Sequence, residues 1–142
     1  MKWYQRALVP ARGFLCFSFA LLCFTGAAFA HHSFAAEYDA SKPITIKGKV
    51  TKFDWVNPHS WVRIDVTDAD GKVTNWSAET APPNILYRQG WRPTSLKEGD
   101  EVIIEGFRAK DSSATMTART VTTADGKKLL AGSADNGPQG KQ

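Results

Sequence analysis

The sequence predicts an all-β domain, a small OB-like five-stranded barrel with a short helix between its third and fourth strands. Three observations predict it. Three runs of strand-like residues are joined by short turns, a proline-to-glycine helical segment follows the third run, and two further runs follow that segment. A closed barrel leaves no exposed strand edge, which suits a small all-β domain. A small β-sandwich is the alternative fold.

Residues 1–30 are expected to be a cleaved signal peptide, which precedes the domain. A positive start (Lys2, Arg6 and Arg12) is followed by an apolar run at residues 14–24, too short to span a bilayer comfortably. Small residues at Ala28 and Ala30 favour cleavage after Ala30, and a cut after Ala28 is the alternative. We therefore expect a periplasmic or secreted protein with no membrane span after cleavage.

Removal of this leader changes the composition. The whole chain has 18 basic and 14 acidic residues, but three of the basic residues are in the leader, so the mature net charge is about +1. Such a balance argues against nucleic acid as a partner. Both cysteines, Cys16 and Cys23, also lie in the leader, which excludes a disulfide or a cysteine metal site in the mature chain. An ordinary apolar core must stabilise the domain.

The domain is expected to span residues 31–131. An N-terminal arm, residues 31–42, has Phe34 and Tyr38 as anchors. The first strand follows at residues 44–55. Its apolar residues change parity, which predicts a bulge or sharp bend near Gly48 or Lys52. Asn57-Pro58 suits the corner that leads to the second strand.

Alternation places the second strand at residues 60–67 and the third at 73–79, joined by an Asp-Gly hairpin turn. Residues 82–90 have the proline and glycine polarity of a short helix, which packing through Ile85, Leu86 and Trp91 must hold. The fourth and fifth strands are expected at residues 101–109 and 115–123, and residues 129–130 add a last short strand. Residues 132–142 are small and polar and are expected to be a disordered tail.

Several separated motifs give the chain a family resemblance. They are HHSF at residues 31–34, WVNPH at 55–59, Asp70-Gly71, Trp76 with Glu79, RQGW at 88–91 and LKEGD at 96–100. In these motifs the chain resembles DUF6152, a family of small exported bacterial proteins of uncharacterised function. The resemblance covers residues 31–130 and implies export to the periplasm and a compact β domain. It implies no reaction and no substrate.

Three histidines suggest a copper site. If cleavage follows Ala30, His31 becomes the N-terminal residue, and its amine and ring Nδ1 can chelate one metal ion. His32 could add a nitrogen and His59 a further imidazole; nitrogen ligands of this kind suit Cu(II) first and Zn(II) second. The alternative is that the His-His pair is a solvated chain start and that His59 is a turn residue. Short histidine motifs do not decide between the two.

A binding module without metal is the second hypothesis. Trp61 and Arg63 share the strand face opposite the apolar residues, and Trp76 and Glu79 lie on the next strand. Aromatic and charged groups on the outer face of such a barrel can bind saccharide, peptide or a partner protein. In the alternative interpretation most tryptophans plug the barrel ends.

No enzymatic activity is expected. The mature chain has no cysteine nucleophile, and no serine has a recognisable histidine and carboxylate arrangement. Glu79 is expected to play a structural role, bonding the backbone or pairing with Arg88. The sequence therefore predicts a monomeric periplasmic binding protein whose partner is an unidentified small ligand or periplasmic protein.

Overall fold

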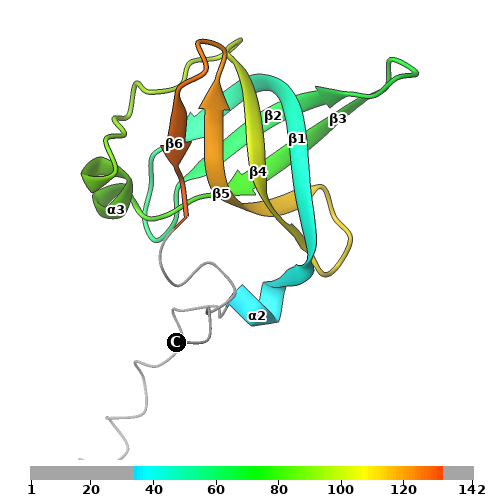
Figure 1. Cartoon of the computed structure of the whole chain (residues 1–142), viewed down its shortest axis with the longest axis horizontal. Coiled ribbons are helices and arrows are strands. Elements are labelled where there is room, and N and C mark those ends of the chain that lie inside the picture. The colour runs from blue at the N-terminus through cyan, green and yellow to red at the C-terminus, as the bar shows by residue number, and fades with distance from the viewer. Residues whose placement is uncertain (1–33, 133–142) are drawn as a thin grey trace, which may run out of the picture. The chain divides into compact units, whose positions relative to one another are not determined.

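The computed structural model describes residues 34–132 as predominantly β, as predicted (Figure 1). The strands are β1 (Tyr38–Asp54), β2 (Trp61–Thr67), β3 (Val73–Glu79), β4 (Glu101–Ala109), β5 (Thr115–Thr123) and β6 (Lys128–Leu130). The helices are α2 (Phe34–Glu37) and α3 (Pro83–Arg88). Neither is long and apolar enough to cross a membrane. The expected signal peptide, His31 and His32, and all but the first residue of the expected tail lie outside the described residues.

The strands form a single sheet in the order β3-β2-β1-β4-β5-β6, in which neighbours are antiparallel. A further pairing joins β3 to β5 in parallel, from Ser77 opposite Thr115 to Glu79 opposite Thr117. Two strands that are far apart in the sheet order therefore lie side by side at this point.

Local sequence determines most strand boundaries. β3, β4 and β5 begin and end at the predicted residues, and β2 begins one residue later than predicted. The hairpin turn between β2 and β3 is held by Asp68, whose carboxylate oxygen accepts backbone N–H groups of Asp70 and Lys72 at 3.0 and 2.8 Å. Gly71 supplies the positive φ of 80° that the turn requires.

The long strand β1 bends as predicted. Its register against β2 shifts between Val50 and Lys52, and its earlier part pairs with β4 instead. A Cβ atom on Gly48 would lie 2.3 Å from the backbone oxygen of Asp65, so only glycine allows this close approach of β1 to β2. The bend lets a single strand pair with neighbours on both sides.

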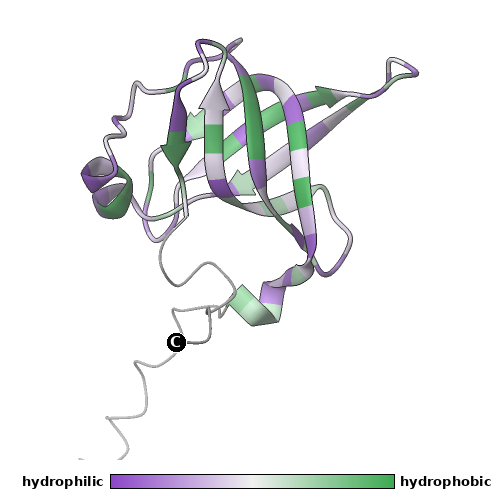
Figure 2. Cartoon of the chain, viewed as in Figure 1, coloured by the Kyte–Doolittle hydropathy of each residue, from purple (hydrophilic) through white to green (hydrophobic). Residues whose placement is uncertain are grey.

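The core lies on one face of these strands. Figure 2 shows hydrophobic bands alternating with hydrophilic ones along the strands. The buried apolar residues come from all six strands and from the segment around α3: Ile46, Val50, Val62, Ile64, Trp76, Ala78, Ala81, Leu86, Trp91, Leu96, Val102, Ile104, Met116, Ala118, Val121, Leu129 and Ala131. Each large aliphatic side chain among them contributes about 1.5–3 kcal/mol by leaving water.

Packing holds the short helix α3, as expected from its length. Leu86 and Trp91 are fully buried, and Ile85 is partly buried against the same core. The Trp91 ring lies 5.6 Å from that of Phe53, and its Nε1–H donates to the backbone oxygen of Leu130 at 2.6 Å. The prediction that Ile85, Leu86 and Trp91 hold the helix is confirmed.

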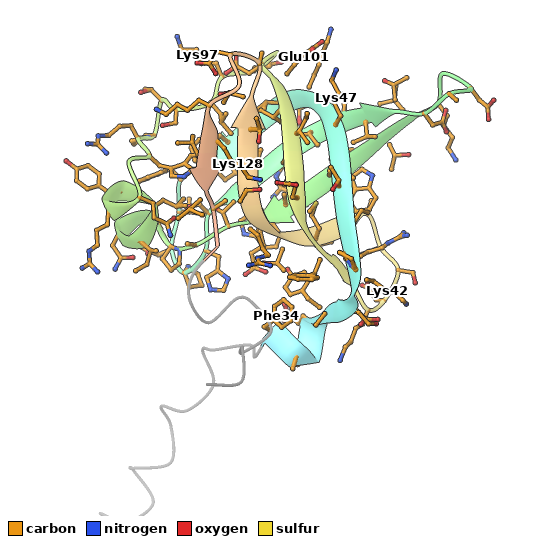
Figure 3. All side chains as sticks on the ribbon, in the orientation of Figure 1. Phe34, Lys42, Lys47, Lys97, Glu101 and Lys128 are labelled. Atoms are coloured by element: carbon orange, nitrogen blue, oxygen red, sulfur yellow. The ribbon has the colours of Figure 1, made fainter. Side chains whose placement is uncertain are left out.

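The N-terminal arm packs on the domain through a second, smaller apolar cluster. Its members are Phe34, Tyr38, Phe107 and Ala109, which we call the arm cluster. The Phe34 ring meets that of Phe107 edge-on at 5.5 Å. Phe34 and Tyr38 are therefore the predicted anchors. Figure 3 shows Phe34 at the α2 end of the strands, away from Lys47 and Glu101 at the other end.

The arm also contains structure that the sequence did not predict. Residues 34–37 form α2, and β1 begins at Tyr38 instead of residue 44. The pairing of Tyr38 with Ala109 is separated from the regular ladder, which resumes at Pro43 opposite Phe107. Contacts with β4, rather than local propensity, therefore extend the strand.

Candidate functional site

The corner at residues 56–60 connects β1 to β2 and carries His59. Its Asn57–Pro58 peptide bond is cis. Ser60 is fully buried, and its carbonyl oxygen accepts the backbone N–H of Thr80 at 2.9 Å and the Thr80 hydroxyl at 3.0 Å. These bonds tie the corner to the end of β3 and so bring His59 next to Glu79.

Glu79 ends β3 and has an unusual environment for a carboxylate. Its parity is opposite to that of the core residue Ala78, yet only 5% of Glu79 is exposed. Its cross-strand partners are Trp61 in β2 and Thr117 in β5, which share its face of the sheet. A buried carboxylate needs hydrogen-bond partners of its own.

Two side chains from distant parts of the chain supply these partners. Tyr38 donates its hydroxyl to Oε2 of Glu79, and Nδ1 of His59 contacts Oε1. The side chain of His59 is 24% exposed, so the buried carboxylate holds the inner edge of a ring that reaches solvent. We call these three residues the Tyr38–Glu79–His59 cluster.

Tyr38 is a neutral donor in this cluster. Burial raises the pKa of its phenol far above the ordinary value of about 10, and the nearby carboxylates of Glu37 and Asp111 raise it further. The hydroxyl therefore keeps its proton at physiological pH and can donate it to Glu79. Tyr38 is the first residue of β1 and directly follows α2, so its hydroxyl reaches Glu79 from the start of that strand.

An open groove of about 430 Å³ adjoins the cluster. Trp61 and Tyr38 line it, together with Ala36, Glu37, Ala109, Lys110, Asp111, Ser113 and Thr115. Trp61 is half-buried, so its indole forms a wall of the groove rather than part of the core. The remaining walls carry charges of both signs and two hydroxyl groups.

Arg63 lies elsewhere on β2, in a surface charge network. Its Nε donates to Asp54 at 3.0 Å and its guanidinium also donates to Ser77 at 3.0 Å. Lys52 approaches the same carboxylate at 2.6 Å. The hydrogen bonds from Lys52 and then Arg63 hold the pKa of Asp54 below its usual range.

Trp76 belongs to the core. It is 9% exposed, and the Arg108 guanidinium lies 5.4 Å from the centre of its ring. A cation at this position stabilises the ring modestly. The interpretation that tryptophans serve packing therefore holds for Trp76 and Trp91, whereas Trp61 borders a groove.

The structure brings together some of the predicted site residues. His59, Glu79 and Trp61 are neighbours, whereas Arg63 and Trp76 occupy other positions. His31 and His32 lie outside the described residues. Within residues 34–132, no group of three or more histidine, cysteine or acidic side chains is placed to hold a metal ion.

Two partnerships were not predicted. Glu79 pairs with Tyr38 and His59 rather than with Arg88. The sequence predicts Tyr38 as an anchor of the arm and does not indicate a role for its hydroxyl. The sequence signal for this pairing is weak, because Tyr38 and Glu79 are 41 residues apart and Glu79 lies on the strand parity opposite to the core.

A family model described as a family of unknown function, DUF6152, matches residues 20–118 of the chain. No curated protein matches it.

Proposed function

This chain belongs to the DUF6152 family, a family of unknown function, and we propose that it is a small periplasmic binding protein that takes up Cu(II) through His31, His32 and His59. The observation that carries the proposal is the contact between Nδ1 of His59 and the buried carboxylate of Glu79. Histidine ligands of metal ions typically hold a carboxylate or carbonyl oxygen with one ring nitrogen and bind the metal with the other. In His59 the ligating atom would be Nε2.

The position of the N-terminal arm also supports the proposal. Tyr38 bonds the same carboxylate as His59, and Phe34 is seated on Phe107 four residues earlier. His32 and His31 precede Phe34 by two and three residues, which an extended chain spans in about 7–10 Å. The first described residue of the arm, Phe34, is thus tied to the cluster that holds His59.

The chemistry of these donors favours copper. After cleavage following Ala30, the free amine and Nδ1 of His31 form a six-membered chelate with one metal ion. His32 and His59 complete a set of nitrogen donors, which Cu(II) binds more tightly than Zn(II) does. The protein binds the ion and carries out no reaction with it.

We further propose that the domain is an OB-like barrel. The pairings β1–β2, β2–β3, β3–β5, β5–β4 and β4–β1 run in a circuit, and α3 lies between β3 and β4 in the chain, which supports this proposal. We also propose that the protein is exported to the periplasm and is a monomer there. The leader-like composition of residues 1–30 supports the export.

The test is a Cu(II) titration followed by electron paramagnetic resonance. The protein is exported from the full-length chain and processed, so that it begins at His31. We expect one site of nitrogen donors, weakened when one residue is added before His31 and again in His59→Ala. Equal and weak binding by the processed and the extended protein would exclude the chelate. Unchanged affinity in His59→Ala would remove His59 from the ligand set.

A second candidate function rests on the groove beside Trp61. Its volume of about 430 Å³ lies within the range of about 300–1,000 Å³ typical of small-ligand sites. An indole wall with hydroxyl and charged groups suits a saccharide or a peptide. In this case the tryptophan fluorescence changes on addition of oligosaccharides or peptides, with or without a chelator, and Trp61→Ala abolishes the response. A response retained in Trp61→Ala would exclude the groove.

A further inference from the structure

We infer that Tyr38 and Glu79 are positioning residues that fix the orientation and tautomer of His59, and that they connect this ring to the seating of the N-terminal arm. The consequence for copper rests on the proposed function. The inference about the ring does not, since it concerns hydrogen bonds within residues 34–132.

Glu79 is held from two sides. Oε2 accepts the Tyr38 hydroxyl and Oε1 contacts Nδ1 of His59, so each oxygen has its own partner. The carboxylate is 5% exposed, and hydrogen bonds to a charged group are stronger in such surroundings than in water. Because Oε2 is occupied by Tyr38, the carboxylate presents Oε1 to an Nδ1–H group of His59.

The contact with Glu79 contributes to the orientation of the His59 ring. The backbone beside it is fixed, because Ser60 bonds Thr80 at the end of β3. Rotation about the side-chain bonds of His59 is not fixed by the backbone, and the ring is partly exposed. A proton on Nδ1 makes this contact a hydrogen bond, which favours one rotamer and the Nδ1–H tautomer.

Tyr38 connects the arm to the Glu79 carboxylate, because its ring packs in the arm cluster and its hydroxyl donates to Glu79. Its ring lies 6.0 Å from Phe34 and belongs to the arm cluster with Phe107 and Ala109. Its hydroxyl reaches Glu79 only while the ring stays in that cluster. When the arm leaves the sheet, Glu79 loses a donor, and the fixed orientation of His59 is lost with it.

The first test measures the tautomer of His59 without metal. Two-bond ¹H–¹⁵N spectra of processed, histidine-labelled protein are recorded over a pH series extending above the ordinary imidazole pKa of about 6.5. We expect the Nδ1–H tautomer in the wild type, whereas free histidine favours Nε2–H. Tyr38→Phe and Glu79→Gln should shift the ring toward Nε2–H.

Matched controls separate positioning from general damage. Tyr87→Phe changes an exposed tyrosine on α3, and Glu105→Gln changes a carboxylate on the outer face of β4, so neither should alter the His59 tautomer. Circular dichroism confirms that each variant is folded. Wild-type protein in the Nε2–H form, or a tautomer unchanged in both Tyr38→Phe and Glu79→Gln, would overturn the inference.

The second test uses Cu(II). Loss of a residue that orients a metal-binding histidine typically costs about 10–100-fold in affinity, and we expect this loss in Tyr38→Phe and Glu79→Gln. The tautomer test and the copper test can give opposite results, so each hypothesis can be refuted without the other. A shifted tautomer in a protein that binds no copper would refute the proposed function and leave the positioning role standing. Copper affinity unchanged in both variants would overturn the connection to the metal.

Discussion

At the scale of single residues, Asp54 and Glu79 show two different uses of a carboxylate. Asp54 lies among cations, with Lys52 at 2.6 Å and Arg63 at 3.0 Å, and contributes as a surface charge. Glu79 is buried, and it contacts a neutral hydroxyl and an imidazole. Burial with so few partners costs stability unless every oxygen is satisfied.

Asp54 makes a pH-dependent contribution to the stability of the folded protein. Asp54→Asn is expected to lower the free energy of unfolding at pH 7 by on the order of 1 kcal/mol or less, because its partners are exposed. The bonds from Lys52 and Arg63 lower the pKa of Asp54 in the folded protein. Its contribution is therefore complete above the ordinary carboxyl pKa of about 3.9 and is lost as the pH falls through the lower, folded value.

Urea unfolding of the wild type and Asp54→Asn between pH 7 and about pH 2 measures this contribution. The difference in unfolding free energy should shrink toward zero at the acid end. Asp70→Asn, in the exposed hairpin turn, is the matched control for loss of one negative charge. A difference that is the same at both ends of the pH range would contradict the predicted mechanism.

At the scale of elements, the local sequence pattern predicted most of the strand boundaries correctly. The alternation and turn residues predicted β3, β4 and β5 to the residue, and the change of parity in β1 predicted its bulge. The sequence pattern did not predict the helix α2 or the first part of β1. Residues 39–42, Asp-Ala-Ser-Lys, lack the alternation of a strand and interrupt the pairing with β4, so only the contacts of the arm cluster reveal that Tyr38 joins the sheet.

The candidate site was harder to predict than the strands. The sequence indicates His59 and Glu79 separately, but it predicts the backbone or Arg88 as the partner of Glu79 and does not link Tyr38 to it. Tyr38 and Glu79 are 41 residues apart, and their contact depends on which strands are neighbours. Periodicity reports which face a side chain occupies and says nothing of which distant side chain it meets there.

At the scale of the whole molecule, the site depends on contacts between segments distant in sequence. The parallel pairing of β3 with β5 places Glu79 opposite Thr117, and the ladder between β4 and β5 sets Phe107 opposite the same threonine. The seat of the N-terminal arm and the carboxylate that holds His59 are therefore built on one continuous piece of sheet. A ligand that joins His59 to the arm would link their stabilities.

Linkage of this kind must be reciprocal: if the seated arm strengthens copper binding, copper must stabilise the seated arm. Hydrogen exchange of the Lys110 amide reports the arm, since this amide donates to the backbone oxygen of Glu37 at 2.9 Å. We expect Cu(II) to slow its exchange by about 10-fold or more, because occupancy at 100 times the dissociation constant contributes about 2.7 kcal/mol.

The reciprocal measurement is copper affinity in Phe34→Ala, which removes the edge-on contact with Phe107 and loosens the arm. A partly buried phenylalanine in such a contact contributes about 1–3 kcal/mol, so affinity should fall about 5–150-fold when the arm is loosened by that amount. Val73→Ala, an exposed apolar residue on the β2–β3 hairpin, is the control and should change neither quantity. If copper slows Lys110 exchange while Phe34→Ala leaves the affinity unchanged, reciprocity is broken, and the protection must come from copper bound at another site.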